Sequence, residues 1–127
     1  MPRALDPEVE DALALLEPLG DVFPRAMFGG WGLYLDGRMF ALIGDGQLYL
    51  KADDETREAF RAAGCRPFGM EIAGKWKELG YWTPPERAAD DRRELLPWAR
   101  RAVEAAARAA EKKAKKASSP ARRTAKS

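Results

Sequence analysis

The spacing of the hydrophobic positions near the N-terminus predicts a short helix. The apolar side chains recur every three or four residues, which places them on one helical face. They are Val9, Ala12, Leu13 and Leu16. Asp6 and Pro7 precede this stripe, and both residue types favour the start of a helix. Pro18 and Gly20 follow it and predict the end of the helix.

Shorter apolar runs separated by turn dipeptides predict a three-stranded antiparallel meander. Its strands are expected at residues 30–36, 38–44 and 47–51. Asp36-Gly37 and Asp45-Gly46 separate them, and Asp-Gly is a strong signal for a two-residue hairpin turn.

Two-residue turns also predict which side chains share a face of this sheet. Leu33 then lies opposite Phe40, and Trp31 lies opposite Leu42. One face would carry Trp31, Leu33, Leu35, Phe40, Leu42 and Tyr49, and the other Tyr34, Met39, Ala41, Ile43, Leu48 and Leu50. A half-solvated antiparallel sheet alternates polar with apolar residues, and this one does not. Either helices and other strands cover both faces, or one face meets a partner protein or a second copy.

The rest of the pattern predicts a helix, two further strands and a long closing helix. The helix begins at Asp53 or Asp54 and ends at Gly64. The strands are expected at residues 66–72 and 75–83, with a bulge or a close backbone approach at Gly80. Pro97 predicts either a kink in the last helix or a start near Leu96. The fold class is therefore predicted to be α+β.

The charge is distributed unevenly and predicts two parts, a domain over residues 1–110 and a basic tail over residues 111–127. The domain has 15 basic and 19 acidic side chains, a net charge of −4, whereas the tail has seven and one, a net charge of +6. An alanine-rich sequence extends the last helix into the tail, and disorder is expected after Ser118-Ser119-Pro120. The tail is either a solubilising extension or a weak, sequence-independent site for nucleic acid. Its candidate phosphate-binding residues are Lys112, Lys113, Lys115, Lys116, Arg122, Arg123 and Lys126.

The residue types that are missing argue against catalysis. The chain has no histidine and one cysteine, so no catalytic triad, disulfide or zinc cluster is expected. Cys65 is interpreted as a small hydrophobic residue. No catalytic residue, cofactor or metal ligand is predicted, and the protein is not expected to be an enzyme. Without a signal peptide or an 18-residue apolar run, it is expected in the cytoplasm, with no membrane contact.

Two stretches carry a family resemblance. Residues 27–43 read MFGGWGLYLDGRMFALI, and residues 48–51 read LYLK. Together with the later Pro67-Phe68 and Tyr81-Trp82 pairs, they resemble the N-terminal domain of the TfoX/Sxy family, bacterial proteins linked to natural competence. The resemblance covers about residues 8–110. It implies the order helix, three strands, helix, two strands, helix, and a role in regulation without catalytic residues. The family namesakes have a second, C-terminal domain. This sequence has a basic tail in that place and therefore resembles the stand-alone versions of the N-terminal domain.

Together these observations predict a regulatory or adaptor module that acts through protein contact. The partner, or a second copy of the chain, would dock on the sheet. The candidate contact residues are Trp31, Leu33, Phe40, Tyr49 and Lys51. Lys51 stands out because the predicted register gives this charged residue at the end of a strand a partly buried position, where it could pair with an acidic group or face a ligand.

Overall fold

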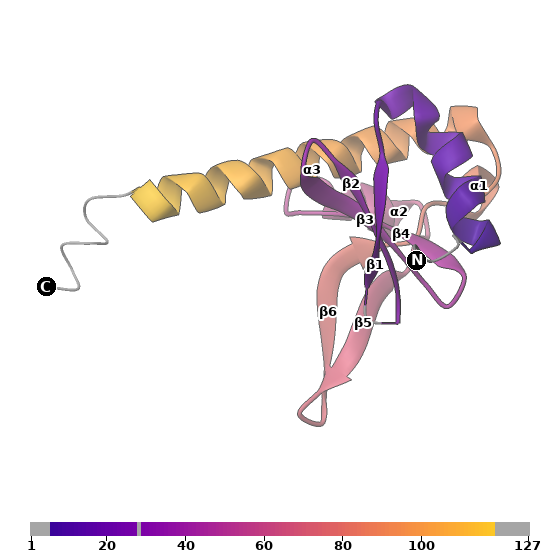
Figure 1. The fold of residues 1–127 in the computed structure, drawn as a ribbon. Coiled ribbons are helices and arrows are strands. Elements are labelled where there is room, and N and C mark those ends of the chain that lie inside the picture. The colour runs from indigo at the N-terminus through magenta and orange to yellow at the C-terminus, as the bar shows by residue number, and fades with distance from the viewer. Residues whose placement is uncertain (1–5, 28, 119–127) are drawn as a thin grey trace, which may run out of the picture.

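A computed structural model of the chain describes residues 6–27 and 29–118 and shows an α+β fold. The helices are α1 (Pro7–Leu16), α2 (Arg57–Ala62) and α3 (Arg92–Ser118), with short 3₁₀ turns η1 (Glu17–Leu19) and η2 (Glu86–Ala88). The strands are β1 (Phe23–Met27), β2 (Gly30–Leu35), β3 (Arg38–Gly44), β4 (Gln47–Lys51), β5 (Pro67–Ile72) and β6 (Lys75–Trp82). The predicted fold class is confirmed (Figure 1).

All six strands form one antiparallel sheet in the order β1-β2-β3-β4-β6-β5. The predicted strands all belong to it, but β1 was not predicted. Pro24 lies within β1, and a proline argues against a strand unless the strand lies at an edge of the sheet. Pro24 stands opposite Leu33 at that edge, so the sequence signal was misleading only because the position of β1 in the sheet was unknown.

The two Asp-Gly turns are confirmed. Asp36 and Gly37 have φ values of 54° and 77°, and Asp45 and Gly46 have 51° and 74°. Both central residues of each turn thus lie in the left-handed region, as in a type I′ hairpin.

The register predicted between β2 and β3 is wrong beyond the first two pairs. Leu35 lies opposite Arg38, as predicted, but Leu33 lies opposite Ala41 rather than Phe40. A β-bulge places Phe40 as an extra residue in β3, because Tyr34 pairs with the residue before it and Leu33 with the residue after it. Every pair farther along the hairpin is therefore shifted by one residue.

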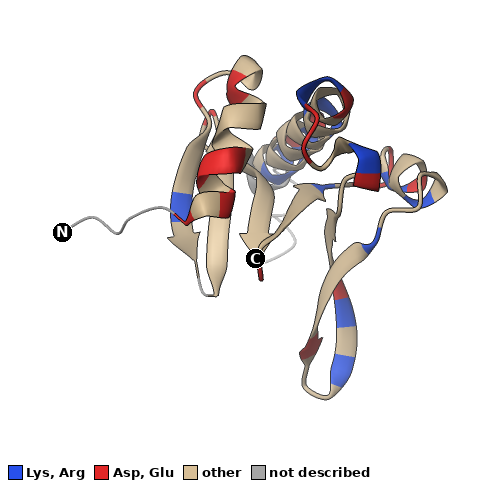
Figure 2. Ribbon diagram, turned by 90° about the vertical axis from the view of Figure 1, so that its right-hand side faces the viewer, with Lys and Arg blue, Asp and Glu red and all other residues tan. Residues whose placement is uncertain are grey.

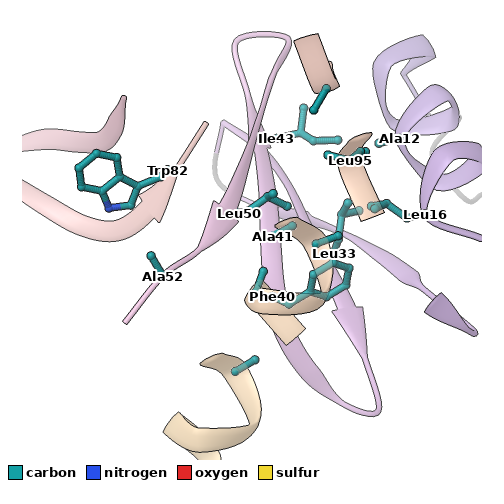
Figure 3. Packing of buried hydrophobic residues seen from close by; sticks show 14 of the residues in the cluster. Ala12, Leu16, Leu33, Phe40, Ala41, Ile43, Leu50, Ala52, Trp82 and Leu95 are labelled. Atoms are coloured by element: carbon teal, nitrogen blue, oxygen red, sulfur yellow. The ribbon is translucent and has the colours of Figure 1, made fainter. Parts of the chain in front are cut away.

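This shift puts two consecutive residues of β3 into the hydrophobic core. Phe40 and Ala41 are both fully buried, on the face of the sheet that α3 covers. Helix α1 packs beside α3 (Figure 1). Figure 3 shows the labelled core residues between the helices and the strands: Ala12, Leu16, Leu33, Phe40, Ala41, Ile43, Leu50, Ala52, Trp82 and Leu95. Helices α1 and α3 thus cover one face of the sheet.

Strand β6 leaves the main sheet at Gly80, which was predicted to mark a bulge. Lys51 pairs with Tyr81, and the Ala52 N–H donates to the Gly80 carbonyl oxygen over 2.8 Å. Gly80 has a φ of 80°, a conformation that favours glycine. Beyond this point β5 and β6 pair only with each other and project away from α3 as a two-stranded arm (Figure 1).

Helix α3 begins at Arg92, so the predicted start near Leu96 is wrong. The Asp91 side chain accepts a hydrogen bond from the Arg93 N–H, and the Asp91 carbonyl accepts one from the Leu95 N–H. Pro97 lies inside the helix, which continues beyond residue 110 to Ser118.

Candidate functional site

Three of the five predicted contact residues lie in the hydrophobic core. Trp31 is 5% exposed, and Leu33 and Phe40 are fully buried. The Trp31 indole Nε1–H also donates a hydrogen bond to Asp6 Oδ2 at 3.0 Å. Because helices cover this side of the sheet, these three residues stabilise the fold and do not form an accessible surface.

Tyr49 and Lys51 lie on the opposite face, which is not covered by a helix within residues 6–27 or 29–118. Tyr49 is opposite Leu42 in the register, as predicted, and its ring centroid is 4.8 Å from that of Phe68. The Lys51 ammonium lies 5.1 Å from the centroid of the Tyr81 ring, within the range of a cation–π contact. The structure therefore separates the predicted group into a buried set of three and an uncovered pair.

This uncovered face contains an apolar groove of about 320 Å³, which we call the open groove. It lies between the β2–β3 region and the β5–β6 arm, because residues from both line it. Its apolar and aromatic lining includes Met27, Met39, Leu42, Phe68, Met70, Leu79 and Tyr81. Of the predicted contact residues, Trp31 also borders this groove, although it is only 5% exposed, whereas Leu33, Phe40, Tyr49 and Lys51 do not line it.

Gly32 on β2 lets two methionines of the open groove approach the backbone of the strand. A Cβ atom at Gly32 would lie 2.8 Å from Met27 Sδ and 2.9 Å from Met39 Sδ, closer than side chains normally approach. The two methionines therefore meet over the bare backbone of β2. Methionine is flexible and polarizable, so such a surface can adapt to the shape of a partner.

The β5–β6 arm supplies the other wall. Side chains of a strand alternate between its two sides, and the pairs Met70–Lys77 and Ile72–Lys75 point to the side of the groove. Met70 and Ile72 are each 44% exposed. Trp76 is 64% exposed and lies on the outer side of the arm, opposite Glu71. The inner side of the arm is thus apolar and basic, whereas its outer side carries Trp76 and Glu71.

The charges of the strand residues also differ between the two faces. Pairing and alternation place four charged strand residues on the uncovered face, and all four are cations: Arg25, Lys51, Lys75 and Lys77. The two strand carboxylates, Glu71 and Glu78, lie on the other side of the arm. None of the four cations forms an ion pair among the described residues. Figure 2 shows the charged bands along the arm beside largely uncharged strands.

The floor of the open groove is uncharged across the physiological pH range. Burial, together with a smaller effect of the neighbouring Tyr34, raises the pKa of the Tyr81 phenol to about 12. Tyr81 consequently keeps its proton, and its hydroxyl is a neutral polar group in an apolar surface.

A second cluster, around Asp53, connects α3 to the segment before α2. Arg108 Nε donates to Asp53 Oδ2 at 2.7 Å and Arg108 Nη2 to Asp53 Oδ1 at 3.1 Å. Asp53 Oδ1 also accepts the N–H groups of Glu55 and Thr56. The Arg108 guanidinium lowers the pKa of the Asp53 carboxyl below its ordinary value. Because its partners occupy this carboxylate, the geometry indicates a structural role. Asp53 was predicted to begin α2, but the helix begins at Arg57, and Asp53 holds the turn before it.

The remaining candidate groups show no arrangement for chemistry. Cys65 is buried, and burial raises the pKa of its thiol, which disfavours the reactive thiolate. The described residues contain no group of three or more His, Cys, Asp or Glu side chains placed to hold a metal ion. Across residues 6–27 and 29–118, no helix has both the length and the apolar character needed to cross a membrane.

The predicted phosphate-binding residues are only partly described. Lys112, Lys113 and Lys115 have exposed side chains in the last turns of α3, and Lys116 belongs to the same helix. Arg122, Arg123 and Lys126 lie outside the described residues. The described part of the tail therefore presents a basic helix end, remote in sequence from the open groove.

Two comparisons with known proteins bear on the fold and the site. A family model described as "TfoX N-terminal domain" matches residues 14–106. A curated relative, "DNA transformation protein TfoX1" of Aliivibrio fischeri (strain ATCC 700601 / ES114), is 40% identical to this chain over 53 residues. The aligned segment is 42% of this chain and 25% of the relative, so the match spans about a quarter of that protein's length.

Proposed function

Because the chain belongs to the TfoX family, as the family match over residues 14–106 shows, we propose that it is a competence-related regulatory module. In this proposal it acts as a non-enzymatic adaptor in the cytoplasm, and it works by holding another protein. The observation that supports the proposal is the open groove, an apolar surface that none of the described helices covers.

Protein contact suits this surface better than small-molecule chemistry does. The lining is formed mainly by methionine, leucine and aromatic side chains, and the sole titratable residue in it is a tyrosine with a raised pKa. Acid–base catalysis needs groups that titrate near the working pH. A large uncovered apolar surface, in contrast, is typical of protein interfaces.

Site-specific photo-crosslinking tests the proposal in the native cell. With a photoreactive amino acid at Leu79, which lines the open groove, we expect one or a few discrete crosslinked proteins. The same amino acid at Trp76, on the outer side of the arm, provides the matched control and should give none of these products. Transcript levels of competence genes in a Met70→Glu strain should fall together with the crosslink. Equal crosslinking from both positions would contradict the proposal.

A second candidate function is weak, sequence-independent binding of nucleic acid through the basic end of the chain. It is favoured by the exposed Lys112, Lys113 and Lys115 side chains on the last turns of α3. Lysines contact phosphates and release counterions, but on their own they do not read bases.

Removal of residues 111–127 tests this second function. If the tail contacts about five phosphates, a threefold rise in salt lowers the affinity of the full chain roughly a hundredfold. The shortened chain should bind a 20-nucleotide DNA far more weakly at low salt while it keeps its crosslink at Leu79. Equal DNA retention by both chains would exclude the tail as the binding site.

A further inference from the structure

We propose that the open groove receives an acidic amphipathic helix of a partner protein. The inference rests on the proposed function and specifies its partner. The apolar stripe of the helix lies against the methionine and aromatic lining of the groove. Aspartate and glutamate side chains on either side of that stripe face the cations of the uncovered face.

Charge complementarity is the first argument for an acidic partner. Arg25 lies on β1, Lys51 on β4, and Lys75 and Lys77 on β6 of the arm, so three strands contribute cations to the face that carries the apolar lining. The described residues offer these four side chains no ion-pair partner. Complementary charge fixes the orientation of a partner and raises its rate of association.

The shape of the surface supports a helix over an added strand. The groove has two walls, the β2–β3 region and the arm, and a helix in a groove buries residues spaced at i, i+3, i+4 and i+7. Strand addition needs a free sheet edge with backbone donors. Pro24 removes one donor from edge strand β1, and β5 begins with Pro67 at the other edge.

A second copy of the chain fits this face poorly. A two-fold dimer brings the same surface of both subunits together. Face-to-face contact of two open grooves would oppose cations with cations, because the strand carboxylates Glu71 and Glu78 lie on the outer side of the arm. Like charges in contact across an interface cost several kcal/mol.

Single-stranded nucleic acid, which cations would also attract, finds no free aromatic platform among the described residues that line the open groove, and the exposed Phe23 ring on β1 lies outside that lining. Bases stack on exposed aromatic ring faces. The Tyr49 and Phe68 rings pack against each other with an angle of 57° between their planes. Tyr81 is 9% exposed and has the Lys51 ammonium over its ring. Flexible methionines line much of the remaining surface, and they suit a protein side chain better than a stacked base.

Binding of designed peptides to the full chain tests the inference. The first probe is a labelled 18-residue helical peptide with leucine and phenylalanine at i, i+3, i+4 and i+7 and with glutamate on both sides of the stripe. The second has lysine in place of every glutamate, and the third has the composition of the first with the stripe scattered. In fluorescence anisotropy at low salt, we expect the first peptide to bind at least about tenfold tighter than either control. Its advantage over the lysine peptide should shrink as salt is added.

Two pairs of variants locate the site. Met70→Glu places a carboxylate on the inner side of the arm and should weaken the first peptide at least tenfold, whereas Trp76→Glu on the outer side should leave its affinity unchanged. Lys77→Glu should weaken it by about threefold, the effect of one exposed charge pair, and Lys113→Glu on α3 should have no effect. Circular dichroism of each variant verifies that the fold is retained.

Several results would overturn the inference. They are absence of binding by the first peptide, equal binding by the first two peptides, and equal effects of Met70→Glu and Trp76→Glu. Displacement of the peptide by oligo(dT) of equal concentration would assign the groove to nucleic acid. A dimer in sedimentation that Met70→Glu dissociates would assign it to a second copy. If the crosslink from Leu79 persists while no helical peptide binds, the proposed protein contact stands and the acidic helix is wrong.

Discussion

Replacing Phe40 with alanine is expected to lower the free energy of unfolding by about 3–5 kcal/mol, the usual cost of removing a buried phenylalanine ring. The side chain is fully buried between the sheet and α3 (Figure 3). The β-bulge causes this burial, since it directs Phe40 and Ala41 into the same core. Small domains are commonly stable by 5–15 kcal/mol, so the variant would lose a large part of its stability.

Tyr49→Ala is the informative comparison. An unbroken register places Phe40 and Tyr49 on one face, whereas the observed register places Tyr49 on the uncovered face. Its ring contacts Phe68 and is partly exposed, so its removal should cost only about 1 kcal/mol.

Urea unfolding monitored by circular dichroism measures both variants. Met39→Ala serves as the neighbouring control, because Met39 lies beside Phe40 in β3 but lines the open groove. Phe40→Ala should shift the unfolding midpoint far more than Met39→Ala or Tyr49→Ala does. Similar shifts for Phe40→Ala and Tyr49→Ala would show that the bulge is not present in solution.

Local rules were enough to predict most of the fold. The two Asp-Gly turns depend on neighbouring residues, and the structure has them where the sequence placed them. Two helix starts differ from the prediction: α2 begins at Arg57 rather than at Asp53 or Asp54, and α3 begins at Arg92 rather than near Leu96. Two features depend on distant parts of the chain and were not predicted. Strand β1 contains Pro24 and became recognisable only from its edge position. The bulge at Phe40 has no turn residue or glycine of its own to mark it.

The candidate site was harder to predict than the fold for the same reason. A shift of one residue in a strand moves its side chains to the other face, so the bulge alone moved Trp31 and Leu33 away from the face of Tyr49. The residues of the arm were missed because their approach to β2 and β3 depends on the departure of β6 at Gly80. Gly80 was the available signal, but a glycine in a strand does not reveal the direction in which the strand turns.

Asp53→Ala is the second large change, and it should lower the free energy of unfolding by about 2–3 kcal/mol. Loss of the hydrogen bonds that Asp53 Oδ1 accepts from the Glu55 and Thr56 N–H groups, in the turn before α2, contributes about 1 kcal/mol. Loss of the charged hydrogen bonds to Arg108 contributes about 1.5–2 kcal/mol. Arg108 Nε also lies 3.2 Å from Glu55 Oε2, and this ion pair still attracts Arg108 to the segment before α2 after the substitution. The effect is expected because this cluster connects α3, through Arg108, to the segment before α2.

The dependence of this stabilisation on pH separates the Arg108–Asp53 ion pair from the hydrogen bonds in the turn before α2. Arg108 depresses the pKa of Asp53 in the native state below the ordinary value of 3.8. The native state then binds fewer protons than the unfolded state at acidic pH, so the contribution is present above 3.8 and is lost as the pH falls toward the native pKa. Arg108→Gln removes the main cause of the depression. The difference in unfolding free energy between the wild type and Arg108→Gln should be constant from pH 7 to 5 and should shrink below pH 4. Arg57→Gln, which breaks the exposed Arg57–Asp54 pair, should cost less than about 0.5 kcal/mol at neutral pH. A wild-type advantage over Arg108→Gln that persists unchanged at pH 3 would mean that Arg108 stabilises the fold by packing rather than through the charge of Asp53.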